Sequence, residues 1–103
     1  MKPTYIVLMG MTELGLEEIM EIPGLIRELK KKLEDNNGEL KGFYKVMGEV
    51  DYVAIFDAPD DDTALAFVMA LGKSGYFKTT TLKAYDIDAM ENALSIYERV
   101  FET

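Results

Sequence analysis

The hydrophobic pattern of the chain predicts two kinds of β-strand. The segments 4–11 and 52–57 are apolar at both alternating sets of positions, which is typical of strands covered on both faces. The segments 39–47 and 76–85 are also β-prone but carry several polar positions, as edge strands do. We therefore expect two central strands and two edge strands.

Other segments carry apolar residues at helical spacing. The first, 13–35, contains Pro23, so we expect a short helical piece followed by a longer helix with the proline in its first turn. A second helix opens at the acidic run 60–62 and continues to about Lys73, with an aspartate as its N-cap. The last amphipathic helix covers about 88–101.

The order of these elements is strand, helix, strand, strand, helix, strand, helix. It predicts an α+β fold of ferredoxin-like βαββαβ type plus a C-terminal helix, with a four-stranded antiparallel sheet in a single domain, 1–103. The first and third strands are central in that topology, in agreement with their apolar pattern. Crossover handedness places both connecting helices on one face of the sheet and leaves the other face bare.

Strand parity assigns an apolar and aromatic set of side chains to the bare face. The set is Tyr5, Val7, Met9, Tyr52, Ala54 and Phe56. So much exposed apolar surface would be unusual for a monomer. The final helix could cover part of it, and a second copy of the chain could cover all of it. We therefore expect a homodimer through the open sheet face, a dimeric α/β barrel.

Composition narrows the chemistry further. The 103 residues include no Cys and no His, and 19 acids against 11 bases give a net charge of −8. Disulfides, thiolate metal sites and His-dependent nucleophiles are therefore excluded. An acidic chain repels phosphate backbones and anionic membranes, so we expect no nucleic-acid or membrane partner. We expect a cytoplasmic location, since a chain without Cys fits a reducing compartment, and we expect no cofactor. We also expect no metal, since a helix start accounts for the acidic run 60–62.

Three charged residues are candidates for chemistry. Glu49 and Asp51 flank the predicted hairpin turn, where two carboxylates could share a proton or bind a polar ligand. Turn-forming preferences explain the same residues without a function. Lys83 is the third candidate.

A larger polar and aromatic group is predicted to share the bare sheet face and to bind a small aromatic or planar ligand. It consists of Tyr5, Tyr52, Thr79, Thr81, Lys83 and Tyr85. Packing at a dimer interface explains the same residues, and we favour that interpretation because aromatic side chains are enriched at interfaces.

Three stretches of the chain resemble the GYD-domain family. They are PTYIVLMGMTELG, GELKGFYKVMGEVDYVAIFDAPDD and TTTLKAY, which lie within residues 3–86. The resemblance implies a small prokaryotic domain of ferredoxin-like, dimeric α/β-barrel type with no established activity. The family's Gly-x-Tyr-Asp element matches Gly48, Glu49, Val50 and Asp51, so that Val50 stands in place of the tyrosine.

Two functions remain open at this point. The preferred one is a non-enzymatic module that dimerises and binds or senses a small molecule. The alternative is a cofactor-independent enzyme, similar to monooxygenases or isomerases on dimeric α/β barrels, which rests on fold analogy. In that case Glu49, Asp51, Lys83 or a tyrosine would have to transfer protons.

Overall fold

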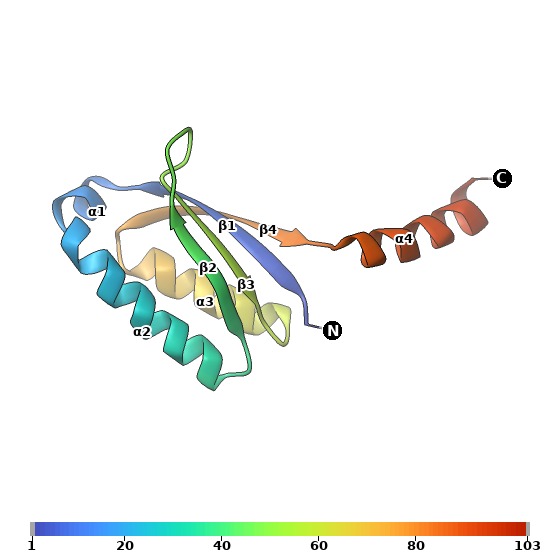
Figure 1. The fold of residues 1–103 in the computed structure, drawn as a ribbon, viewed down its shortest axis with the longest axis horizontal. Helices are drawn as coiled ribbons and strands as arrows, with labels where there is room; N and C mark the ends of the chain where they lie inside the picture. The colour runs from blue at the N-terminus through green and yellow to red at the C-terminus, as the bar shows by residue number, and fades with distance from the viewer. Residues whose placement is uncertain (1, 103) are drawn as a thin grey trace.

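The computed structural model describes residues 2–102 and shows a twisted sheet with two long helices packed on one face (Figure 1). The elements in chain order are β1 (Thr4–Met11), α1 (Glu13–Glu17), the 3-10 turn η1 (Ile19–Glu21), α2 (Ile22–Asp35), β2 (Glu39–Lys45), β3 (Tyr52–Asp57), α3 (Asp61–Lys73), β4 (Phe77–Ala84), α4 (Ile87–Ile96) and the π-helical turn η2 (Tyr97–Phe101). The antiparallel strands are ordered β2-β3-β1-β4. The predicted fold is confirmed, with β1 and β3 in the centre.

Side-chain caps fix where the helices begin. The Asp60 carboxylate accepts a hydrogen bond of 2.8 Å from the Thr63 amide at the start of α3, and Asp86 caps α4 in the same way. Pro23 lies in the first turn of α2, as the sequence predicts. Asn37 follows α2 with φ 67°, the left-handed conformation that commonly ends a helix.

The prediction of which side chains point to the bare face is wrong. The set assigned to it is instead at most 4% exposed and packs beneath α2 and α3: Tyr5, Val7, Met9, Tyr52, Ala54 and Phe56. The ring of Phe56, for example, lies 4.6 Å from that of Phe67 on α3. Both alternating sets of β1 and β3 are apolar, so parity separates the sets without showing which set meets the helices.

The opposite set forms the face that no helix covers, which we call the open face. Its apolar members are Ile6, Leu8, Tyr44, Val53, Ile55 and Leu82. They are partly or largely exposed, up to 53% for Tyr44 and 46% for Leu82. At one end of the face, Asp57 pairs with Lys41 at 3.2 Å and accepts the Thr4 hydroxyl at 2.7 Å. The open face is thus an apolar surface with a polar end.

The C-terminal helix α4 extends away from the sheet (Figure 1), and the molecule measures 56 × 32 × 18 Å. No residue of α4 or η2 is buried. Their exposed apolar side chains are Ile87, Met90, Leu94, Ile96, Tyr97, Val100 and Phe101. Of the helices in residues 2–102, none is long and apolar enough to cross a membrane.

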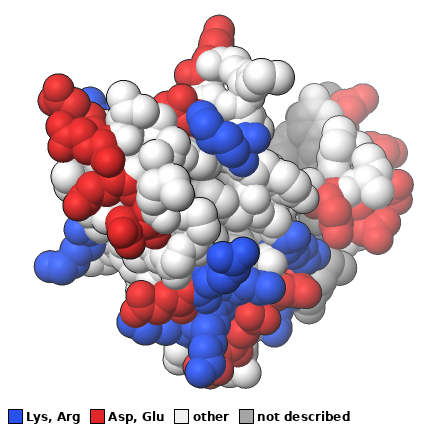
Figure 2. All heavy atoms as spheres, turned by 60° about the vertical axis from the view of Figure 1, so that its left-hand side comes forward, with Lys and Arg blue, Asp and Glu red and all other residues white. Residues whose placement is uncertain are grey.

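Charges are unevenly distributed on the side of the molecule that carries α1 and α2. Acidic side chains gather along one edge, and basic and acidic ones mix at the bottom of the view (Figure 2). A continuous band of uncharged side chains lies between them.

Candidate functional site

Three of the predicted ligand-binding residues meet at one hollow. The β1–β4 register sets Tyr5 opposite Lys83, and Thr81 precedes Lys83 by two residues on β4. All three side chains therefore point toward the helix side of the sheet. Together with side chains of α3 they line a hollow of about 270 Å³. The structure brings these three residues together, but beside α3 and not, as the sequence predicted, on the open face.

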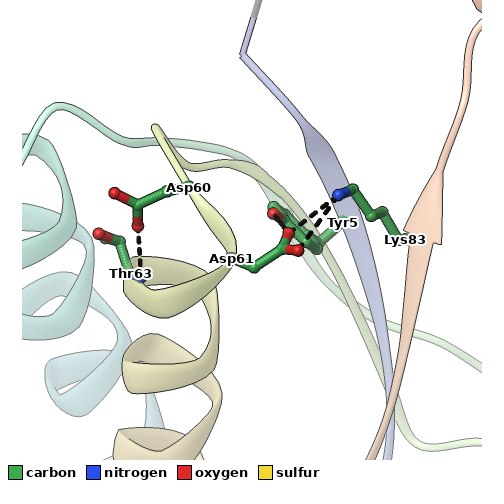
Figure 3. Close-up of polar contacts among 5 residues, drawn as sticks. All are labelled: Tyr5, Asp60, Asp61, Thr63 and Lys83. Atoms are coloured by element: carbon green, nitrogen blue, oxygen red, sulfur yellow. Dashed lines mark hydrogen bonds and ion pairs between the residues drawn. The ribbon is translucent and has the colours of Figure 1, made fainter.

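The centre of this hollow is a cluster of Tyr5, Asp61 and Lys83 (Figure 3). The Tyr5 hydroxyl donates a hydrogen bond to Asp61, and the Lys83 ammonium lies 3.0 and 3.3 Å from the two oxygens of the same carboxylate. Asp61 is the first residue of α3, next to the capping Asp60. The acidic run 60–62 is predicted only as a helix start, so the contacts of Asp61 with the sheet were not predicted.

The cluster holds each group in its usual protonation state at neutral pH. Burial, reinforced by the hydrogen bond to Asp61, raises the pKa of Tyr5 to about 12. The Tyr5 hydroxyl, and after it Lys83, lowers the pKa of the Asp61 carboxyl, while the hydrogen bond to Asp61 raises the pKa of Lys83. A neutral phenol, a carboxylate and an ammonium group therefore stand side by side. This arrangement suits polar recognition, because a lysine that acts as a base needs a lowered pKa.

The other predicted ligand-binding residues lie elsewhere. Tyr52 lines a separate hollow near the start of α2, and burial raises the pKa of its phenol. Thr79 is opposite Met9 on the helix side. Tyr85 follows the end of β4 and is 70% exposed.

The predicted acidic pair lies at the loop between β2 and β3. This loop covers 46–51, is longer than the tight turn expected, and stands out from the sheet (Figure 1). Gly48 has φ 150°, which favours glycine. Asp51 accepts the Met11 amide at 2.7 Å, and its own amide donates to a carbonyl of β1 at 2.9 Å. Asp51 therefore anchors the loop to β1, whereas Glu49 is exposed.

Comparisons with known proteins place these features in a family. The model of the GYD domain matches residues 5–94 and so reaches into α4. The chain is 34% identical over 86 residues to a Thermus thermophilus protein named "Glutamine synthetase and cystathionine beta-lyase binding protein", a match that covers 82% of this chain and 90% of that protein.

The fold is also found among solved structures. The crystal structure of MtbAldR superposes with a TM-score of 0.62 at 14% identity, over 82% of this chain and 52% of that one. This chain thus corresponds to about half of MtbAldR, and the likeness shows the fold alone. The family match and the T. thermophilus relative go further: the chain belongs to the GYD-domain family.

Proposed function

We propose that this chain is a cytoplasmic, homodimeric binding module that docks on enzymes. The observation that carries the proposal is the amount of apolar surface left uncovered, on the open face and on α4. Isolated monomers seldom expose contiguous apolar patches of this kind. The chain also belongs to the same family as a protein named for binding two enzymes.

The open face fits a second copy of the chain. Four strands of about seven residues give a flat footprint of roughly 450 Å², and the relief of the side chains adds to it. Stable interfaces bury about 800 Å² per partner. The apolar centre around Val53 and Ile55, with the Lys41–Asp57 pair at one end, matches the apolar core and polar rim of such interfaces.

The projecting helix α4 supplies the surface for a partner enzyme. Its exposed residues Met90, Leu94 and Tyr97 recur at spacings of four and three residues. An amphipathic helix with such a stripe is suited to an apolar groove on another protein. Dimerisation would present two such helices and increase the avidity for an oligomeric enzyme.

The oligomeric state tests the first part of the proposal. Leu82→Asp places a charge on the open face, and Leu65→Asp places the same charge on α3, where the leucine is 60% exposed. Sedimentation velocity should show a dimer for the wild type and for Leu65→Asp, and a folded monomer for Leu82→Asp. A wild type that is monomeric at about 50 µM, far above the dissociation constants of stable dimers, or a dimer unaffected by Leu82→Asp, would refute pairing through this face.

Direct binding tests the second part. The probes are purified glutamine synthetase and cystathionine β-lyase of the organism that encodes the chain, measured by biolayer interferometry. We expect binding of at least one enzyme, and its loss in Leu94→Asp, with the dimer intact. If the wild type binds neither enzyme, the docking role is wrong even where the dimer is found.

A second candidate function is the binding of a small polar or aromatic molecule at the cluster of Tyr5, Asp61 and Lys83. The hollow of about 270 Å³ beside these residues supports it. The enzyme alternative has weaker support, because the pKa of Lys83 is raised and Asp51 is engaged with backbone groups. Lys83→Met should abolish binding at this hollow in a thermal-shift screen of phenols and small acids; equal shifts in both proteins would contradict this assignment.

A further inference from the structure

A second hollow lies between the start of α2 and the strands β2 and β3. Its volume is about 480 Å³, within the range of ligand pockets. The lining residues are Ile19, Ile22, Pro23, Ile26, Arg27, Phe43, Lys45 and Tyr52. Ile22 and Tyr52 are 3% and 4% exposed, and the Phe43 and Tyr52 rings lie 5.4 Å apart. The floor is therefore apolar and partly aromatic.

Two cations stand on opposite walls of this hollow, and no acid lines it within residues 2–102. Arg27 comes from α2 and makes no ion pair with any residue in that range. Lys45 comes from β2, with its ammonium 4.9 Å from the centre of the Tyr52 ring. The ammonium also forms an ion pair of 3.6 Å with the Asp51 carboxylate and donates to the Asp51 carbonyl at 3.3 Å. A hollow with only basic groups is unusual in a chain of net charge −8.

We propose that this hollow binds a small carboxylic acid with an aromatic or branched apolar body. The body would displace water from the floor formed by Ile22, Phe43 and Tyr52, which is favourable in proportion to the apolar area covered. The carboxylate would lie between Arg27 and Lys45, where charge-assisted hydrogen bonds compensate for its lost hydration.

The site is independent of the proposed dimer. Phe43 and Lys45 pair with Ala54 and Tyr52 in the β2–β3 register, so they point to the helix side of the sheet. Two copies joined through their open faces would leave this hollow accessible. The inference therefore goes beyond the proposed function, and either one can fail alone.

A matched pair of small molecules tests the charge requirement. The probes are 3-phenylpropionate and 3-phenylpropanamide, which share the same apolar body, added to the ¹⁵N-labelled full chain. Ligands of this size bind with dissociation constants of about 0.1–10 mM, a range that chemical-shift titration measures. We expect the acid to bind at least fivefold more tightly than the amide and to shift the amides of Ile26 and Phe43.

Charge-removing variants locate the site. Arg27→Gln and Lys45→Gln should each weaken binding of 3-phenylpropionate about two- to fivefold, as for partly exposed ion pairs. The affinity for 3-phenylpropanamide should not change in either variant. Lys31→Gln is the control, because this exposed lysine on α2 does not line the hollow. Circular dichroism checks that each variant is folded. Equal affinities for acid and amide, or an unchanged acid affinity in the double variant, would overturn the proposal.

Discussion

Removal of one hydroxyl from the cluster of Tyr5, Asp61 and Lys83 tests how Asp61 holds α3 to the sheet. Tyr5→Phe keeps the ring, which is 4% exposed and stacked on Phe56 with a centroid distance of 5.2 Å. The substitution removes the hydrogen bond that the phenol donates to Asp61 and leaves the packing of the ring in place. The variant thus separates polar bonding from packing.

The size of the effect follows from the partners. A hydrogen bond to a charged group contributes about 1.5–3 kcal/mol, and a neutral pair about 1 kcal/mol. Asp61 is exposed and keeps its ion pair with Lys83, so solvent compensates part of the loss. We expect Tyr5→Phe to lower the free energy of unfolding by about 1 kcal/mol, or about 4–8 °C in Tm. Tyr5→Ala, which also empties the space of the ring, should cost about 3–5 kcal/mol.

Urea unfolding followed by circular dichroism measures these changes at pH 7. In an Asp61→Ala background Tyr5→Phe should have a much smaller effect, because the acceptor is already gone. The pKa of Asp61 is lowered in the folded state, so its contribution is full above the unfolded value and is lost as pH falls through the folded pKa. The cost of Tyr5→Phe should therefore be smaller at an acidic pH, below the ordinary carboxyl value of 3.8, than at pH 7. An equal cost in both backgrounds and at both pH values would refute the role of this hydrogen bond.

Four further experiments test separate parts of the structure. Because the pKa of Tyr5 is raised to about 12, folding stability should fall as pH rises from about 10 to 12. Tyrosinate absorbs in the near ultraviolet, so absorbance measures the titration of the tyrosines. In Tyr5→Phe the step at the highest pH should be missing from the titration curve. Gly15→Ala would bring a Cβ within 2.4 Å of a backbone oxygen before β4 and should cost about 1–3 kcal/mol in urea unfolding. Gly24→Ala, which meets nothing within 4 Å on α2, should instead stabilise the chain by about 0.5–1 kcal/mol. Asp51→Ala removes the acceptor that ties the β2–β3 loop to β1 and should speed amide hydrogen exchange in residues 46–51, which an unchanged exchange rate would contradict.

The hydrophobic pattern was sufficient for the topology. Polar positions in β2 and β4 marked them as edges, and Pro23 marked the start of α2, because these signals are local. No local signal shows which side of β1 and β3 faces the helices, because both sides are apolar. Only the three-dimensional packing of α2 and α3 decides which side is covered. The prediction of Tyr5 and Tyr52 on the open face failed for that reason.

The site was predictable in part for a similar reason. Strand parity sets Thr81 and Lys83 on one side of β4, and the β1–β4 register brings Tyr5 to the same face. Asp61 was missed because a helix start fully explains an aspartate at that position. One signal could have found it: α3 begins directly after β3, at the same end of the sheet where Tyr5 and Lys83 are paired. An acid there meets both a helix N-terminus and the strand pair.

The two faces of the sheet have different surroundings, and this difference predicts how the proposed activities are related. Val53 points to the open face, and its neighbour Tyr52 points into the hollow that contains Arg27 and Lys45. Dimerisation would bury the first face without touching the walls of the hollow. Coupling between two sites requires that one ligand change the affinity for the other, and none of the apolar residues of the open face lines the hollow. The affinity for 3-phenylpropionate should therefore agree within about twofold between the wild-type dimer and the Leu82→Asp monomer. A larger difference would mean that pairing reshapes β2 and β3, and the hollow would then be a sensor of assembly.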